Sequence, residues 1–158
     1  MKQDRVLVGI LIGIGLLAAL AVGIFFLRKG DQGYGSEDTA EGVVRNYILA
    51  LQNQDYDKAY EYLADEKDRP DITTFQTNLL ASGVEIQRVA VEIGDVNSSG
   101  DRSLVGLTLV HPGNGLFGDV WRETQSAILL RSSQGEWKVV SMPYPFWFSN
   151  WYYPTVKP

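Results

Sequence analysis

The sequence predicts an α+β domain that follows a single apolar segment. Residues 6–27 contain no charged side chain, residues 39–82 carry apolar residues at helical spacing, and residues 84–142 carry them at alternate positions. Helical periodicity followed by alternation is typical of helices packed on one face of an antiparallel sheet. We therefore predict one transmembrane helix, then three helices packed on a curved antiparallel sheet of about four strands.

Residues 1–29 are predicted to form a membrane anchor. An uncharged helix over residues 6–27 would be about 33 Å long, against a hydrocarbon core of ~30 Å. The apolar run ends directly at Arg28 and Lys29 and offers no small-residue cleavage site. We therefore expect an uncleaved, single-pass signal anchor rather than a removable signal peptide.

Small residues recur along the anchor at spacings that bring them together on a helix. Such residues let two helix backbones approach closely, so we predict contact with another transmembrane helix. The alternative is that they simply face lipid. The predicted helix-packing residues are Gly9, Gly13, Gly15, Ala19 and Gly23.

Charge and composition narrow the classes of function. Residues 1–30 hold four basic residues and one acidic residue, so a chain of net charge -5 leaves -8 on the remainder. An acidic domain disfavours nucleic-acid partners. There is no cysteine and one histidine, which removes thiolate metal sites and most haem ligation. We expect no cofactor and no metal, and we place the domain outside the cytoplasm, at the cell membrane.

A flexible linker over residues 30–37 is predicted to precede a domain over residues 38–142. Three glycines in the linker favour disorder. Asp38 is predicted to cap the first helix, residues 39–53, with Glu41 completing a capping box.

Two further helices are predicted before the sheet. Asp55 can cap a second helix through residue 63, and Asp71 can cap a third. Gly83 is predicted to end the third helix, because glycine is favoured just beyond a helix C-terminus.

Four strands are predicted from the alternating pattern. The first begins at Val84, with a bulge near Gln87-Arg88 where the apolar phase changes. The others are residues 104–110, 120–131 and 137–142, separated by Gly-rich turns.

Several short segments of the sequence resemble the nuclear-transport-factor-like, ketosteroid-isomerase-like superfamily of cone-shaped α+β domains. The residues that carry the resemblance are the first helix, the segment 53–60 and the closing hairpin 133–139, and it covers residues 38–142. The resemblance implies a pocket on the concave face of the sheet. It also implies a fold that hosts enzymes, binding proteins and assembly modules alike, many of them anchored extracytoplasmic domains.

Candidate catalytic residues are few. His111 lies in a Pro/Gly segment, and we expect it to be a solvated turn residue. Residues 122–126 are polar within a predicted strand. The resemblance implies an acid and a hydrogen-bond donor in the pocket, roles that Glu123 and Tyr47 could fill. The alternative, which we favour, is an open sheet face wetted by solvent, so no catalytic residue is predicted.

The last segment, residues 143–158, is rich in aromatic residues and proline. Seven aromatics occupy ten positions: Tyr144, Phe146, Trp147, Phe148, Trp151, Tyr152 and Tyr153. They could fill the domain's own cavity, lie among lipid headgroups or dock on a partner. We predict that they contact a partner or the membrane surface.

These features together predict a non-catalytic accessory subunit of a larger bacterial membrane complex. An electron-transfer complex such as alternative complex III is one example of such a host. Its expected partners are the lipid bilayer and other membrane-protein subunits. The alternatives are an anchored binding module for a small apolar ligand and, less favoured, an isomerase or hydratase.

Overall fold

The computed structural model describes residues 10–20, 33–67, 69–113, 118–148 and 151. The chain divides into two units, Met1–Tyr34 and Gly35–Pro158. In the first unit, residues 10–20 are helical. Within the described ranges, no helix is long and apolar enough to cross a membrane. The predicted packing residues Gly9 and Gly23 lie outside these ranges.

The second unit begins earlier than the predicted residue 38. Both backbone groups of Gly35 are bound by the buried side chain of Asn46: the amide donates to Oδ1 at 2.8 Å and the carbonyl accepts from Nδ2 at 2.9 Å. The end of the predicted flexible linker is therefore fixed to the domain. The sequence could not indicate this, because the bond joins residues eleven apart.

Four helices follow among the described residues of the second unit. They are α2 (Ala40–Gln52), α3 (Tyr56–Glu61), α4 (Ile72–Ala81) and α5 (Gly83–Arg88). Asp55 and Asp71 cap α3 and α4 as predicted, accepting from Lys58 and Thr74 amides. The cap of α2 is Thr39 rather than Asp38, and its hydroxyl accepts from the Gly42 amide at 3.0 Å.

Helix α5 replaces the predicted start of the first strand. In a strand, Val84 and Ile86 would share one face, but in a helix they point in nearly opposite directions. Val84 is 73% exposed and Ile86 is 1% exposed. Ile86 and Val89, three positions apart, are both buried, which is the helical pattern. Gly83 therefore begins α5, and no bulge forms at Gln87-Arg88.

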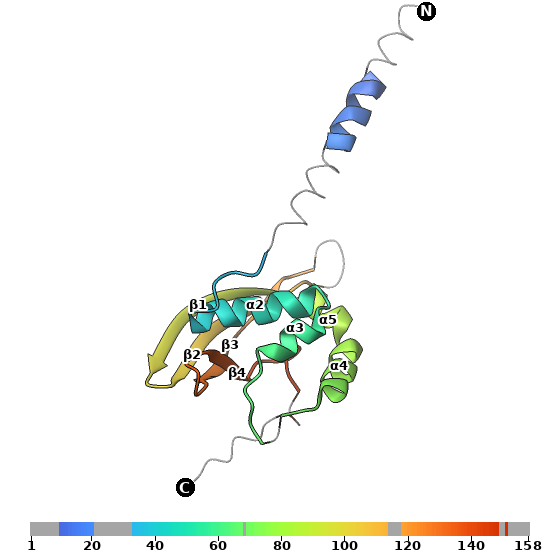
Figure 1. Cartoon of the computed structure of the whole chain (residues 1–158). Helices are drawn as coiled ribbons and strands as arrows, with labels where there is room; N and C mark the ends of the chain where they lie inside the picture. The colour runs from blue at the N-terminus through green and yellow to red at the C-terminus, as the bar shows by residue number, and fades with distance from the viewer. Residues whose placement is uncertain (1–9, 21–32, 68, 114–117, 149–150, 152–158) are drawn as a thin grey trace, which may run out of the picture. The chain divides into compact units, whose positions relative to one another are not determined.

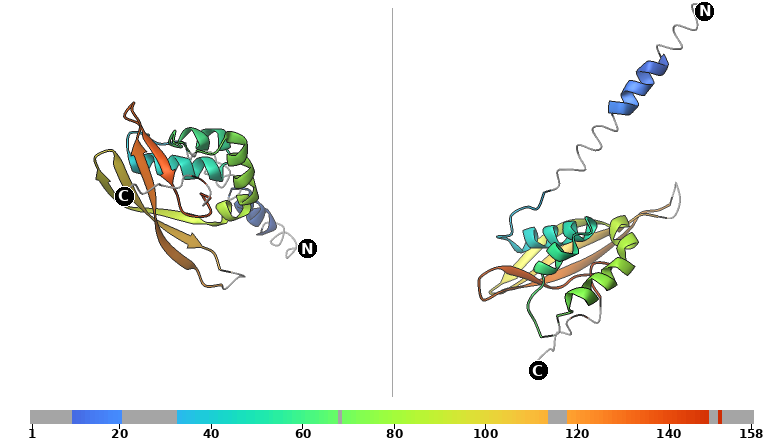
Figure 2. Two further views of the ribbon diagram at one scale, coloured as in Figure 1. Left: turned by 90° about the horizontal axis from the view of Figure 1, so that it is seen from below. Right: turned by 45° about the vertical axis from the view of Figure 1, so that its right-hand side comes forward.

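The sheet is the predicted antiparallel meander. Its strands are β1 (Ala90–Ser99), β2 (Arg102–His111), β3 (Trp121–Arg131) and β4 (Trp137–Ser141), in the order β1-β2-β3-β4. The register of β1 on β2 shifts between Ile93 and Val96. Gly106 lies opposite this irregularity, where an added Cβ would come within 3.3 Å of the Asp95 carbonyl oxygen. The helices lie over one face of the curved sheet, here called the inner face (Figures 1 and 2).

The aromatic tail folds back into the domain's own core. Phe146, Trp147 and Trp151 are buried, and Trp151 stacks on Phe75 with ring centroids 5.1 Å apart. The hydroxyl of Tyr47 donates to the Phe146 carbonyl at 2.9 Å. The three buried side chains would have to leave this core to form a docking surface, so this part of the contact prediction is corrected. Tyr152 and Tyr153 lie outside the described residues.

Strand β4 covers only part of its neighbour. It pairs with β3 at Ile128–Arg131. The other edge of β4 is bound by the α3–α4 connection, since the Val139 amide donates to the Tyr62 carbonyl at 2.8 Å. Among the described strands, none pairs with β3 on that side over residues 121–127, which leaves this stretch of backbone at an edge.

Candidate functional site

Strand β3 passes from a filled half to an open half of the inner face. Alternate residues of a strand share a face, so Trp121, Glu123 and Gln125 lie on the same side as Ala127 and Leu129. Ala127 and Leu129 are fully buried beneath the helices and the tail. Glu123 is half-buried, Gln125 is exposed and Trp121 is 57% exposed. We call the region around Ala127 and Leu129 the filled half, and the region around the other three the open half.

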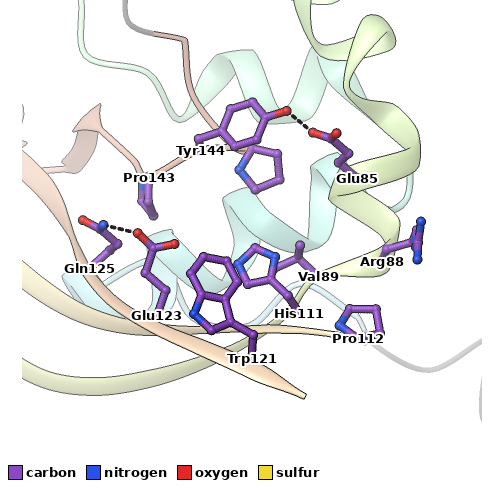
Figure 3. Close-up of a pocket in the computed structure, with 11 residues that line it drawn as sticks. Glu85, Arg88, Val89, His111, Pro112, Trp121, Glu123, Gln125, Pro143 and Tyr144 are labelled. Atoms are coloured by element: carbon purple, nitrogen blue, oxygen red, sulfur yellow. Dashed lines mark hydrogen bonds between the residues drawn. The ribbon is translucent and has the colours of Figure 1, made fainter. Parts of the chain in front are cut away.

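The open half forms one wall of a pocket of about 620 Å³ (Figure 3). The pocket brings together α5, the end of β2, the start of β3 and the segment that follows β4. Its lining is largely aromatic and proline, with acidic, basic and amide side chains among them. The lining residues are Glu85, Arg88, Val89, His111, Pro112, Trp121, Glu123, Gln125, Pro143, Tyr144 and Pro145.

Both carboxylates in the pocket are held by neutral donors. The side-chain amide of Gln125 donates to Oε1 of Glu123, and the hydroxyl of Tyr144 donates to Oε2 of Glu85. Figure 3 places these two pairs on different walls of the pocket. A carboxylate accepts several hydrogen bonds, so each acid is positioned by its donor and keeps acceptor capacity for another group.

His111 is part of this pocket, contrary to the prediction of a solvated turn residue. It is the last residue of β2 and lies opposite Trp121 in the register, with the two ring centroids 4.5 Å apart. Its Nε2 atom is buried and has no hydrogen-bond partner within the described part of the chain. The imidazole lies against the indole at an interplanar angle of 33° and forms part of the pocket wall.

Glu123 and Tyr47, which could have filled the acid and donor roles implied by the resemblance, are directed to different places. The Tyr47 hydroxyl is directed to the Phe146 carbonyl inside the core, whereas Glu123 lines the pocket. Arg122 lies on the opposite face of β3 and binds both oxygens of Glu92 at 2.9 and 3.0 Å. The polar run thus divides between the two faces of the sheet.

Sequence reasoning missed the two partners that complete the pocket, Glu85 and Tyr144. They lie 59 residues apart in the chain. The alternating pattern had assigned Glu85 to a strand, and Tyr144 belonged to a segment whose packing the sequence left open. The exposed position of Tyr144, beside buried neighbours, separates it from the rest of the aromatic set.

A second cluster of charges joins the start of the domain to α3. The Tyr62 hydroxyl donates to Oε1 of Glu37 at 2.6 Å, and Lys58 Nζ lies 3.5 Å from the same carboxylate. The hydrogen bond from Tyr62, with the charge of Lys58, lowers the pKa of Glu37 against the opposing effect of partial burial. Burial, with the carboxylate of Glu37, raises the pKa of Tyr62 to about 12. We infer that these interactions hold the start of the domain against α3, at the edge of the filled half.

Among the described residues, no group of three or more His, Asp or Glu side chains could hold a metal ion. The candidate site is therefore defined by the pocket and its polar side chains.

Several solved structures resemble this domain. A candidate ketosteroid isomerase from Shewanella frigidimarina gives a TM-score of 0.50 at 18% identity, over 68% of this chain and 95% of that one. A SEC-C-motif protein from Rhodopseudomonas palustris gives 0.48 at 16% identity, over 66% and 77%. A candidate nuclear-transport-factor-like transpeptidase from Campylobacter jejuni gives 0.42 at 13% identity, over 60% and 90%. No family model and no curated protein matches the chain.

The first of these likenesses supports the fold expected from the sequence. The domain has an α+β fold similar to that of this candidate ketosteroid isomerase. At 18% identity this likeness is evidence for the fold alone, and proteins with the same fold can have many different functions. What the pocket does must therefore be argued from its own side chains.

Proposed function

We propose that this protein is a non-catalytic binding module that holds a small organic molecule in the pocket of the open half. The observation that supports the proposal is the pocket itself, in which two positioned carboxylates stand among aromatic and proline side chains. Ligand sites are typically concave and mostly apolar, with a few placed polar groups, and occupy ~300–1,000 Å³. A volume of about 620 Å³ lies within that range.

Binding is favoured over catalysis by the way the polar groups are engaged. General acid–base chemistry needs an acid and a base within reach of the same substrate atom. The Tyr47 hydroxyl is bound inside the core, and the Tyr144 hydroxyl is directed to Glu85. An isomerase or hydratase is the alternative. It would be recognised by turnover that falls by several orders of magnitude in Glu123→Gln while the protein stays folded.

A fragment screen tests the binding proposal directly. The full chain in a non-ionic detergent would be screened by thermal shift against a chemically mixed fragment library. We expect hits that disappear in the double variant Trp121→Ala/Glu123→Ala. The matched control is Arg122→Ala/Glu92→Ala, which alters the opposite face of the sheet and should keep the hits. Hits that are unaffected by the first variant would overturn the proposal.

We propose the membrane anchor from the sequence. Residues 6–27 are uncharged over a length that suits a bilayer, and we place the domain behind them on the extracytoplasmic side of the cell membrane. Carbonate-washed membranes should retain the protein, and its intact mass should include the first residues. A mature protein that starts near residue 30 would contradict the proposal of a membrane anchor.

The second candidate is the accessory subunit of a larger membrane complex. The supporting observation is the edge of β3 at residues 121–127, flanked by the exposed Trp121 and Tyr144. An extended segment of a partner protein can add to such an edge. Purification in mild detergent distinguishes the two candidates, because a subunit migrates in a stable complex and a binding module migrates alone.

A further inference from the structure

We infer that the pocket takes an organic cation, a ligand whose protonated amine lies between Glu123 and the indole of Trp121. This inference rests on the proposed binding function and names the chemical class of the ligand. It is carried by the side chains of the β3 wall, by the charge of the pocket and by the charge of the domain.

The β3 wall presents a carboxylate beside an open aromatic face. Trp121 and Glu123 are two residues apart on one face of β3, which places their Cα atoms about 7 Å apart. The indole is 57% exposed and is backed by the His111 ring at 4.5 Å. Aromatic faces attract cations through the ring quadrupole, and tryptophan does so best. An ammonium between the two side chains would contact both.

The charges around the pocket favour a cation over an anion. Of the lining residues that the structure describes, two are acidic, Glu85 and Glu123, and one is basic, Arg88. Arg88 lies on α5, one helical turn from Glu85, and in Figure 3 it stands across the view from Glu123. The positive charge of Arg88 therefore offsets the negative charge of Glu85 on the α5 wall. The β3 wall keeps the negative charge of Glu123.

The net charge of the domain also favours a cation over an anion. The chain beyond residue 30 carries a net charge of -8, which raises the local concentration of cations and repels carboxylates and phosphates. The carboxylate of Glu123 accepts from a neutral amide, Gln125, so the charge of the acid is not compensated by that bond. A protonated amine would supply the missing positive partner.

Three probes that share one ring separate the charge classes: benzylamine, benzyl alcohol and benzoate. Their dissociation constants would be measured at neutral pH by ligand-observed NMR with the full chain in non-ionic detergent. We expect benzylamine to bind roughly tenfold or more tightly than either of the others. Glu123→Gln should weaken benzylamine roughly tenfold, since a charge-assisted hydrogen bond is lost. Trp121→Ala should weaken it roughly fivefold.

The matched control is Glu92→Gln, which removes an exposed acid from the opposite face of the sheet and should change the affinity less than twofold. Equal weakening by Glu92→Gln and Glu123→Gln would mean that the amine binds the acidic surface at large, and would overturn the inference. Tighter binding of benzyl alcohol or benzoate, lost in Trp121→Ala, would reject the cation while leaving the pocket as a binding site. If none of the three probes binds, both the inference and the proposed function fail.

Discussion

The filled half and the open half of the inner face are built on the same strand and differ in what covers them. At Ala127 and Leu129, β3 is buried beneath the helices and the returning tail. At Trp121 and Glu123, the same phase of the strand faces a pocket. The alternation of the strand is unbroken between the two halves. The side chains change from aliphatic to polar where the cover ends.

The tail explains why the cover stops where it does. Phe146 and Trp151 fill the space over the filled half, and the segment that leads to them, Pro143 to Pro145, forms the boundary of the pocket. One segment therefore completes the core and shapes the site. The comparison teaches that polar residues on the core phase of a strand mark the part of a sheet that the described residues leave uncovered.

The largest expected effect separates the two halves by stability. Trp151→Ala should lower the free energy of unfolding by about 3–5 kcal/mol, because a buried indole leaves a cavity. Trp121→Ala, the matched change in the open half, should lower it by about 0.5 kcal/mol or less. Urea unfolding of the full chain in detergent, followed by circular dichroism, measures both. Similar losses at the two positions would erase the distinction between the halves.

Removal of residues 144–158 extends this test. The deletion takes away Phe146, Trp147 and Trp151 together, and small domains have only about 5–15 kcal/mol of stability in total. We therefore expect the remaining chain to lose its fold, where a tail that only docks on a partner would leave the domain folded. A cooperative unfolding transition in the truncated protein would contradict the assignment of the tail to the core.

A smaller effect is expected from single hydroxyl groups. Tyr47→Phe removes the donor to the buried Phe146 carbonyl and should cost about 1–3 kcal/mol. Tyr144→Phe removes a hydroxyl at the exposed surface of the pocket and should cost about 0.5 kcal/mol or less. The same urea titrations compare them. A larger loss of unfolding free energy in Tyr144→Phe than in Tyr47→Phe would contradict this account, in which the stabilising hydrogen bond belongs to the filled half.

Much of the filled half could be predicted from sequence, because its signals are local. Asp55 and Asp71 cap helices through bonds to residues three positions on, and the β3–β4 hairpin is marked by Gly135 at φ 86°. The aromatic content of the tail indicated burial but not its partner, since Tyr47 and Phe146 are 99 residues apart. Helix α5 was missed because the spacing of Val84 and Ile86 matches a strand, although the spacing of Ile86 and Val89 matches a helix.

The open half could be predicted only in part. The polar residues at 122–126 indicated an uncovered face, and Glu123 was identified as a candidate. Its neighbours come from α5 and the tail, and no local pattern specifies that they meet. His111 became a pocket residue because β2 extends to it, beyond the predicted end at residue 110.

A further expected effect concerns pH at the edge of the filled half. The pKa of Tyr62 is raised to about 12 from an ordinary value near 10. The folded state therefore holds this proton more tightly, so its contribution is fully present below pH 10 and is lost as the pH rises towards 12. The urea midpoint of the wild type should fall more steeply over this range than that of Tyr62→Phe. Parallel curves would show that Tyr62 titrates normally.

The division of the inner face is tested most directly by the four tryptophans. Trp121 lies in the open half, whereas Trp137, Trp147 and Trp151 are buried. The full chain would be labelled with 5-fluorotryptophan, its signals assigned by single Trp→Phe variants, and titrated with benzylamine in detergent. We expect the ¹⁹F signal of Trp121 to move to saturation while the other three stay in place. Movement of the Trp147 and Trp151 signals, with Trp121 unchanged, would contradict a pocket separate from the core.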